Sequence, residues 1–125
     1  MKLLYSDILP LGMEDGQTSI IDCFHEQIAD CDGADIAVGY VSRAALEELD
    51  MLAAEHGLRH ISLTMGMYYV EGMPESTYRT ALAINEKWRS AGIGEIRVVR
   101  AFKYHGKVYV FHKDGDVKSA ILGSG

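Results

Sequence analysis

The chain has 125 residues, of which 48% are apolar, 24% are charged and two are proline. This length supports one hydrophobic core but not two domains, and the composition excludes a disordered chain or a fibrous repeat. The formal net charge of −6 argues against a protein that wraps nucleic acid over its whole surface. We therefore expect a single domain over residues 1–125.

The charge is unevenly distributed along the chain. Residues 1–94 hold six Lys and Arg against fifteen Asp and Glu, whereas residues 95–125 hold six against three. A basic C-terminal part permits one phosphate-binding patch on an otherwise acidic protein, although a small asymmetry of this kind also arises by chance.

Hydropathy and cysteine positions bear on the compartment. Apolar stretches are only a few residues long, too short for a membrane span or a signal peptide. Cys23 and Cys31 are eight residues apart in an expected helix, about 12 Å at the helical rise. Two Cα atoms that far apart cannot be bridged by a disulfide. We expect a cytoplasmic protein with no membrane contact.

The first half of the chain alternates helices and strands. A helix is predicted from Asp15 to about Asp30, because apolar residues recur at helical spacing (Ile20, Ile21, Phe24 and Ile28). Residues 34–41 form an apolar run that predicts the first strand. Ser42 then caps a second helix that ends at Gly57, and residues 59–65 alternate as a second strand.

The second half continues this alternation and closes on a hairpin. Residues 75–91 predict a third helix, stopped by Gly92, and residues 95–99 predict a third strand. Two further strands, 107–111 and 117–122, flank Asp114-Gly115, a dipeptide typical of tight hairpin turns. The order αβαβαβ plus hairpin predicts an α/β fold with a mixed, mostly parallel sheet flanked by helices.

One irregular segment, residues 66–74, directly follows the second predicted strand. Ligand sites of α/β sheets gather at such positions. The segment is also compatible with an ordinary loop whose aromatic residues cover the core.

The last third of the chain carries the candidate chemistry. Residues i and i+2 of a strand point to the same face, about 6.6 Å apart, so His105 and Lys107 stand side by side with Tyr109 and Phe111 beyond them. The Lys107 ammonium can neutralise phosphate oxygens, while the His105 imidazole can attack phosphorus or move a proton. The hairpin then returns Gly123-Ser124-Gly125, whose amides and hydroxyl can meet the same phosphate.

These residues resemble the phospholipase D superfamily motif, in which His-x-Lys is followed by an acid and then by Gly-Ser-x-Asn. The Gly after His105, the strand Lys-Val-Tyr-Val-Phe and the loop Gly-Met-Tyr-Tyr are most similar to the N-terminal nuclease domain of NgoFVII-type restriction endonucleases. The resemblance implies a metal-independent phosphodiesterase that cleaves DNA through a phosphohistidine. It also implies a homodimer that shares one active site, and a separate C-terminal DNA-recognition domain.

Two positions depart from the motif. The residue seven positions after His105, where the superfamily has an aspartate, is His112. The motif asparagine would be residue 126, one position beyond the sequence, so we expect a truncated domain that is inactive as a fragment.

Other functions compete with this interpretation. His56 and His60 are four residues apart, but Gly57 interrupts the helix that would align them as metal ligands. Asp30, Asp32 and Asp35 match a calcium loop only in part, because no ligand glutamate follows. We therefore expect no metal and no cofactor. A non-catalytic module for dimerisation or DNA contact, and a phospholipid-processing enzyme, stay open as alternatives.

Overall fold

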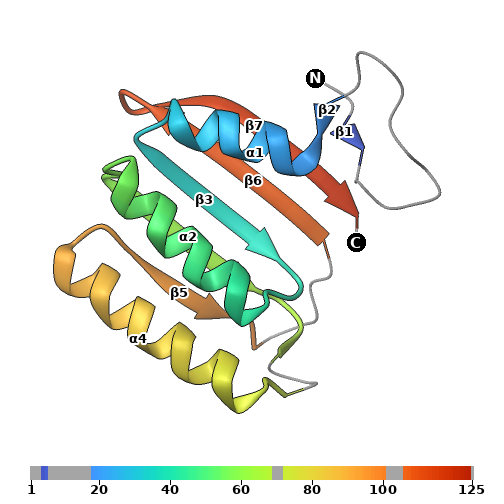
Figure 1. Cartoon of the computed structure of the whole chain (residues 1–125), viewed down its shortest axis with the longest axis vertical. Helices are drawn as coiled ribbons and strands as arrows, with labels where there is room; N and C mark the ends of the chain where they lie inside the picture. Colours follow the sequence, from blue (N-terminus) through green and yellow to red (C-terminus); the bar gives the residue numbers. More distant parts are fainter. Residues whose placement is uncertain (1–3, 6–17, 69–71, 101–105, 125) are drawn as a thin grey trace.

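The computed structural model describes residues 4–5, 18–68, 72–100 and 106–124, and side chains within 24–68, 72–100 and 106–122. Three helices and seven strands occur in these ranges (Figure 1). In chain order they are β1 (Leu4–Tyr5), β2 (Thr18–Ser19), α1 (Ile20–Ala29), β3 (Gly33–Val38), α2 (Arg43–Glu55), β4 (His60–Met65), α4 (Glu75–Ala91), β5 (Gly94–Val98), β6 (Gly106–Lys113) and β7 (Asp116–Ser124).

The predicted element order is present, preceded by the short strands β1 and β2, which the sequence did not predict. These two strands pair in parallel with each other, while the other five form a sheet of order β5-β4-β3-β6-β7. The expectation of a mixed sheet flanked by helices is confirmed, but the sheet is parallel at only two of its four strand pairs rather than mostly parallel. The β3–β4 and β4–β5 pairs are parallel, whereas β3–β6 and β6–β7 are antiparallel.

Local sequence signals explain where the elements begin and end. The Ser42 hydroxyl accepts a hydrogen bond from the backbone N–H of Ala45 at 3.1 Å, which caps α2 as predicted. Gly92 ends α4 in the left-handed conformation with φ of 71°. Asp114 and Gly115 have φ of 54° and 85°, so the β6–β7 turn has the backbone expected of a tight hairpin.

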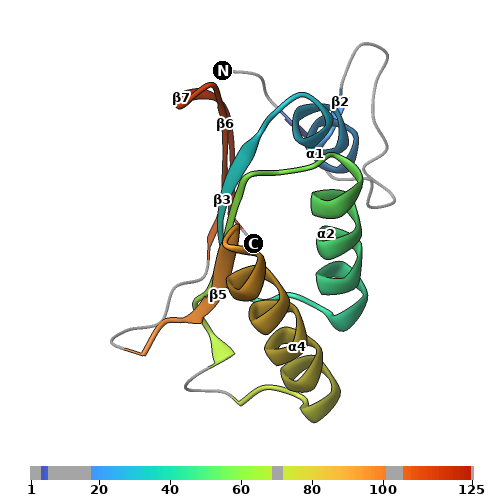
Figure 2. The same cartoon turned by 90° about the vertical axis from the view of Figure 1, so that its left-hand side faces the viewer.

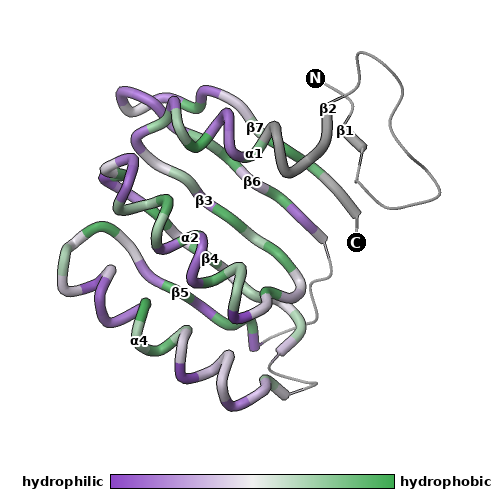
Figure 3. Tube along the Cα trace, viewed as in Figure 1, coloured by the Kyte–Doolittle hydropathy of each residue, from purple (hydrophilic) through white to green (hydrophobic). Residues whose placement is uncertain are grey.

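All three described helices cover the same face of the five-stranded sheet (Figure 2). The chain moves from β3 to β4 to β5 in one direction, and right-handed crossovers then place α2 and α4 on one side. The core between these layers contains Trp88, Phe111, Ile28, Leu46 and Met65, each with at most 1% of its surface exposed. Hydrophobic residues follow the central strands accordingly (Figure 3).

Candidate active site

The C-terminal ends of β3 and β4 meet the start of β6 at one edge of the sheet. Val38, the last residue of β3, pairs with Lys107, and the Gly39 N–H donates to the Gly106 carbonyl at 3.2 Å. The Gly66 N–H donates to the Val38 carbonyl at 2.9 Å. Lys107 therefore stands where parallel strands end, the region in which α/β sheets bind ligands.

The hairpin brings the predicted Gly-Ser segment to the same edge. In the β6–β7 register, Lys107 lies opposite Gly123 and Gly106 lies opposite Ser124. The two halves of the predicted motif, sixteen residues apart in sequence, are thus neighbours at the backbone level. His105, Gly125 and the side chain of Ser124 lie outside the described part of the chain.

The prediction that Lys107, Tyr109 and Phe111 point to the same face of β6 is confirmed. Phe111 is fully buried under the helices, and the rings of Tyr109 and Phe111 lie 5.5 and 5.9 Å from the ring of Phe24 in α1. Lys107 continues this face toward the edge, where it is exposed. His112 has the opposite parity and points to the face that carries none of the described helices.

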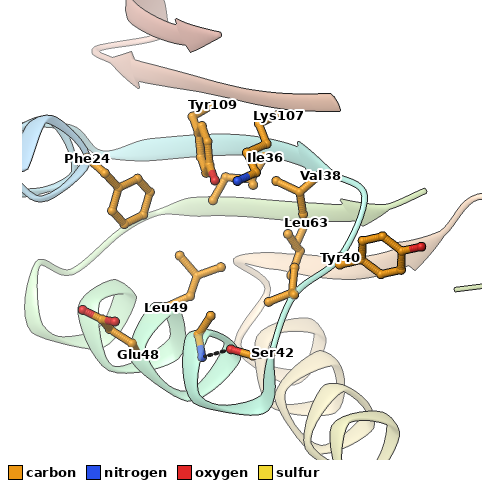
Figure 4. Close-up of a pocket in the computed structure, with 12 residues that line it drawn as sticks. Phe24, Ile36, Val38, Tyr40, Ser42, Glu48, Leu49, Leu63, Lys107 and Tyr109 are labelled. Atoms are coloured by element: carbon orange, nitrogen blue, oxygen red, sulfur yellow. Dashed lines mark hydrogen bonds between the residues drawn. The ribbon is translucent and has the colours of Figure 1, made fainter. Parts of the chain in front are cut away.

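A cavity of about 280 Å³ opens beneath Lys107, between the sheet and helices α1 and α2. Its walls are mostly apolar and include Phe24, Ile36 and Leu49, while Lys107 and Tyr109 enter it from β6 (Figure 4). Burial raises the pKa of the Tyr109 hydroxyl above its ordinary value, so it stays a neutral hydrogen-bond donor near pH 7. Sequence reasoning missed this cavity, because its walls come from five separate elements (α1, β3, α2, β4 and β6).

The segment after β4 is anchored to the neighbouring loop. The Tyr68 hydroxyl donates to the Val41 carbonyl at 2.8 Å and accepts from the Val41 N–H at 3.1 Å. The Tyr68 ring also packs edge-on against Tyr40, with ring centroids 5.3 Å apart. The described start of this loop therefore anchors the β3–α2 connection, and Tyr68 also packs against the hydrophobic core, as expected for a loop whose aromatic residues cover the core. Residues 69–71 lie outside the described part.

His112, at the position where the resemblance predicts an aspartate, belongs to a separate polar cluster. Its Nε2 lies 2.6 Å from one Asp35 oxygen, and the other Asp35 oxygen contacts His60 Nε2 at 2.8 Å and the Ser62 hydroxyl. Partial burial acts to raise the pKa of Asp35, but hydrogen bonds from Ser62, His60 and His112 outweigh it and lower that pKa. His112 is about 17 Å along the strand from Lys107. The cluster therefore lies on the opposite face and at the opposite end from the candidate site.

The other acidic residues considered as ligands have protein partners. Asp30 pairs with Lys113 and Lys118, both at 2.9 Å, which lowers its pKa to about 2, and Asp32 accepts the Asp114 N–H. No group of three or more His, Cys, Asp or Glu suited to a metal ion occurs among the described residues. Within the same ranges, no helix is long and apolar enough to cross a membrane.

Fold and geometry together define an α/β domain with a mixed five-stranded sheet. The basic residue Lys107, near the start of β6, lies at the carboxyl ends of the parallel strands of this sheet. A family model described as the NgoFVII restriction endonuclease N-terminal PLD domain matches residues 18–125. The chain belongs to this family, which indicates a nuclease role. No curated protein matches the sequence.

Proposed function

We propose that this domain hydrolyses phosphodiester bonds of DNA without a metal ion, as the catalytic part of a type II restriction endonuclease with a separate DNA-recognition domain. In this proposal His105 is the nucleophile. Lys107 and the Gly123-Ser124 segment hold the phosphoryl oxygens. Two copies of the chain form one active site, because the reaction needs a nucleophile and an acid while each chain supplies one motif histidine.

The proposed reaction proceeds in two displacements at phosphorus. A ring nitrogen of His105 attacks phosphorus, the bond to the leaving deoxyribose oxygen breaks, and that oxygen takes a proton from the protonated His105 of the second copy. The second histidine, now neutral, removes a proton from water. The water oxygen then attacks phosphorus, the nitrogen–phosphorus bond breaks, and the first His105 is restored. Lys107 offsets the charge that develops on the non-bridging oxygens.

The observation that carries this proposal is the register of β6 and β7, which sets Lys107 opposite Gly123 and Gly106 opposite Ser124. Family membership supports DNA as the substrate. The position of Lys107 also supports the proposal: it is exposed at the carboxyl end of the parallel strands, and none of the described residues forms an ion pair with it.

The first test concerns metal independence. We expect the full-length protein to cleave DNA, or a bis-phenyl phosphodiester, in excess EDTA at the rate found without the chelator, because the proposed chemistry uses only side chains. Cleavage that appears only after Mg²⁺ or Zn²⁺ is added would contradict the mechanism.

A second arm of this test separates His105 from His112. We expect His105→Ala to abolish turnover and to leave the melting temperature within a few degrees, since a polar residue next to a strand start contributes little to the core. His112→Ala should retain most activity, because His112 contacts Asp35 at the other end of the sheet. Cleavage by His105→Ala at the unmodified rate would contradict His105 as the nucleophile, whereas an unmodified protein that binds DNA without cleaving it would favour a non-catalytic DNA-contact module. Cleavage of phospholipid vesicles but not of DNA would favour the lipid-processing alternative.

A further inference from the structure

The cavity beside Lys107 combines an apolar interior with polar groups at its two ends. Lys107 and Tyr109 enter from the sheet, whereas the carboxylate of Glu48 lies at the α2 side, away from Lys107 (Figure 4). Among the described residues, neither the Lys107 ammonium nor the Tyr109 hydroxyl has a hydrogen-bond or ion-pair partner. Donors without protein partners around an apolar space are the arrangement by which pockets orient a ligand.

The walls of the cavity include both aromatic and aliphatic side chains. Phe24 from α1 and Tyr109 from β6 contribute aromatic surfaces, and Ile36, Leu49 and Leu63 supply aliphatic ones. Its volume of about 280 Å³ lies just below the range of about 300–1,000 Å³ found for small-molecule pockets. Aromatic and aliphatic side chains are the surfaces between which enzymes hold a base extruded from the stack.

We propose that this cavity binds a single nucleobase carrying an exocyclic amino group, whose attached phosphate lies at Lys107. This inference rests on the proposed function for the phosphate at Lys107. The ammonium complements the phosphate, and the Glu48 carboxylate accepts hydrogen bonds from the amino group at the other end, as acidic side chains do from cytosine. Glu48 also contacts His25 at 3.1 Å, which holds the carboxylate at the α2 side of the cavity.

A large side chain introduced on helix α2 can block the pocket, and the same side chain at a neighbouring position outside the pocket serves as the control. Ala45 lines the cavity and its neighbour Ala44 does not, although both are exposed in the first turn of α2. Ala45→Phe places a ring in the cavity, while Ala44→Phe adds the same ring outside it. The Ser42 cap contacts only the backbone N–H of Ala45, so both variants keep the cap.

The measurement is the affinity of the full-length protein for deoxycytidine 5′-monophosphate, deoxythymidine 5′-monophosphate and deoxyribose 5-phosphate by calorimetry. We expect the cytosine nucleotide to bind about tenfold more tightly than the base-free sugar phosphate, because stacking of one base contributes a factor of about five to about a hundred. Ala45→Phe should remove this difference and Ala44→Phe should retain it. Glu48→Gln should reduce the preference for cytosine over thymine, and Lys107→Ala should weaken all three compounds alike.

The proposal that this cavity binds a nucleobase is overturned if the base-free compound and the nucleotides bind equally. It is also overturned if Ala45→Phe and Ala44→Phe have equal effects. If Ala45→Phe does not fold, nuclear Overhauser contacts between base protons and the rings of Phe24 and Tyr109 decide the same question in the unmodified protein, and their absence overturns it.

Cleavage of DNA, measured in parallel, separates the two proposals. If the unmodified protein shows no base-dependent affinity but cleaves DNA, and Ala45→Phe cleaves at the same rate, the pocket is contradicted and the phosphodiesterase activity is supported. If the unmodified protein binds nucleotides in a base-dependent way that Ala45→Phe abolishes, but does not cleave DNA, the pocket is supported and the phosphodiesterase activity is contradicted.

Discussion

At the scale of single residues, the most informative departure concerns the position at which the resemblance predicts an aspartate. His112 occupies it and bonds to Asp35 of the adjacent strand, about 17 Å from Lys107 and on the other face. A carboxylate is thus present in this region of the sheet, but β3 supplies it. Because the cluster lies away from the candidate site, its role in this domain is to connect β3, β4 and β6 through side chains.

Replacing Asp35 tests that role. We expect Asp35→Asn to lower the free energy of unfolding by about 1 kcal/mol near neutral pH, a modest value because the carboxylate is partly exposed and solvent screens its interactions. DNA cleavage should be retained. The pKa of Asp35 is lowered in the folded protein, so its stabilisation is present above the unfolded value of about 3.9 and is lost as the pH falls through the lowered pKa.

Urea unfolding across this pH range provides the measurement. The difference between Asp35→Asn and the unmodified protein should shrink as the pH falls from neutral to about 3. Asp116→Asn, at the start of β7, is the control for loss of one negative charge. A difference that stays constant with pH would show that the substitution acts through packing.

At the scale of elements, the sequence predicted where helices and strands begin and end better than it predicted which strands pair with each other. Helix α4, the Ser42 cap and the Asp114-Gly115 turn follow from local signals, and the structure confirms each of them. The position of β6 does not, because its partner β3 ends about seventy residues earlier and local periodicity carries no information on distant pairing. The antiparallel insertion of β6 beside β3 is what makes the sheet mixed, and it also brings Lys107 to Val38.

The pairing of β4 and β5 depends on one glycine. A Cβ atom built on Gly94 would lie 1.6 Å from the backbone carbonyl oxygen of Ile61, a contact that no rotamer can relieve. We expect Gly94→Ala to destabilise the domain by about 3 kcal/mol or more, since the backbone of β4 or β5 must move. Gly33→Ala is the control, because its nearest contacts would be ordinary at 3.4 Å. Thermal unfolding of the two variants should differ by many degrees, and similar melting temperatures would contradict the close approach.

At the scale of the whole molecule, one face of the sheet carries the three described helices and the other carries none of them. The proposed site lies on the helix-covered face, at the end of the sheet where β6 begins, and its two parts depend on different contacts. The backbone of Gly123-Ser124 depends on the hairpin, while the orientation of Lys107 depends on the face that packs against α1 and α2. The sequence predicted both features of β6, its face and its return strand, because a two-residue period and a tight turn are local.

The proposed shared site predicts a dimer whose stability depends on anions. One chain supplies one motif histidine, and the chemistry needs two, so we expect a two-fold dimer with an isologous interface around Lys107. Two Lys107 ammonium groups in one cleft repel each other, and a bound sulfate offsets this repulsion and stabilises the dimer by mass action. Sedimentation of the full-length protein should therefore show tighter association in sulfate than in chloride at equal ionic strength, and Lys107→Ala should abolish that difference. A protein that stays monomeric at micromolar concentration and still cleaves DNA would refute the shared site.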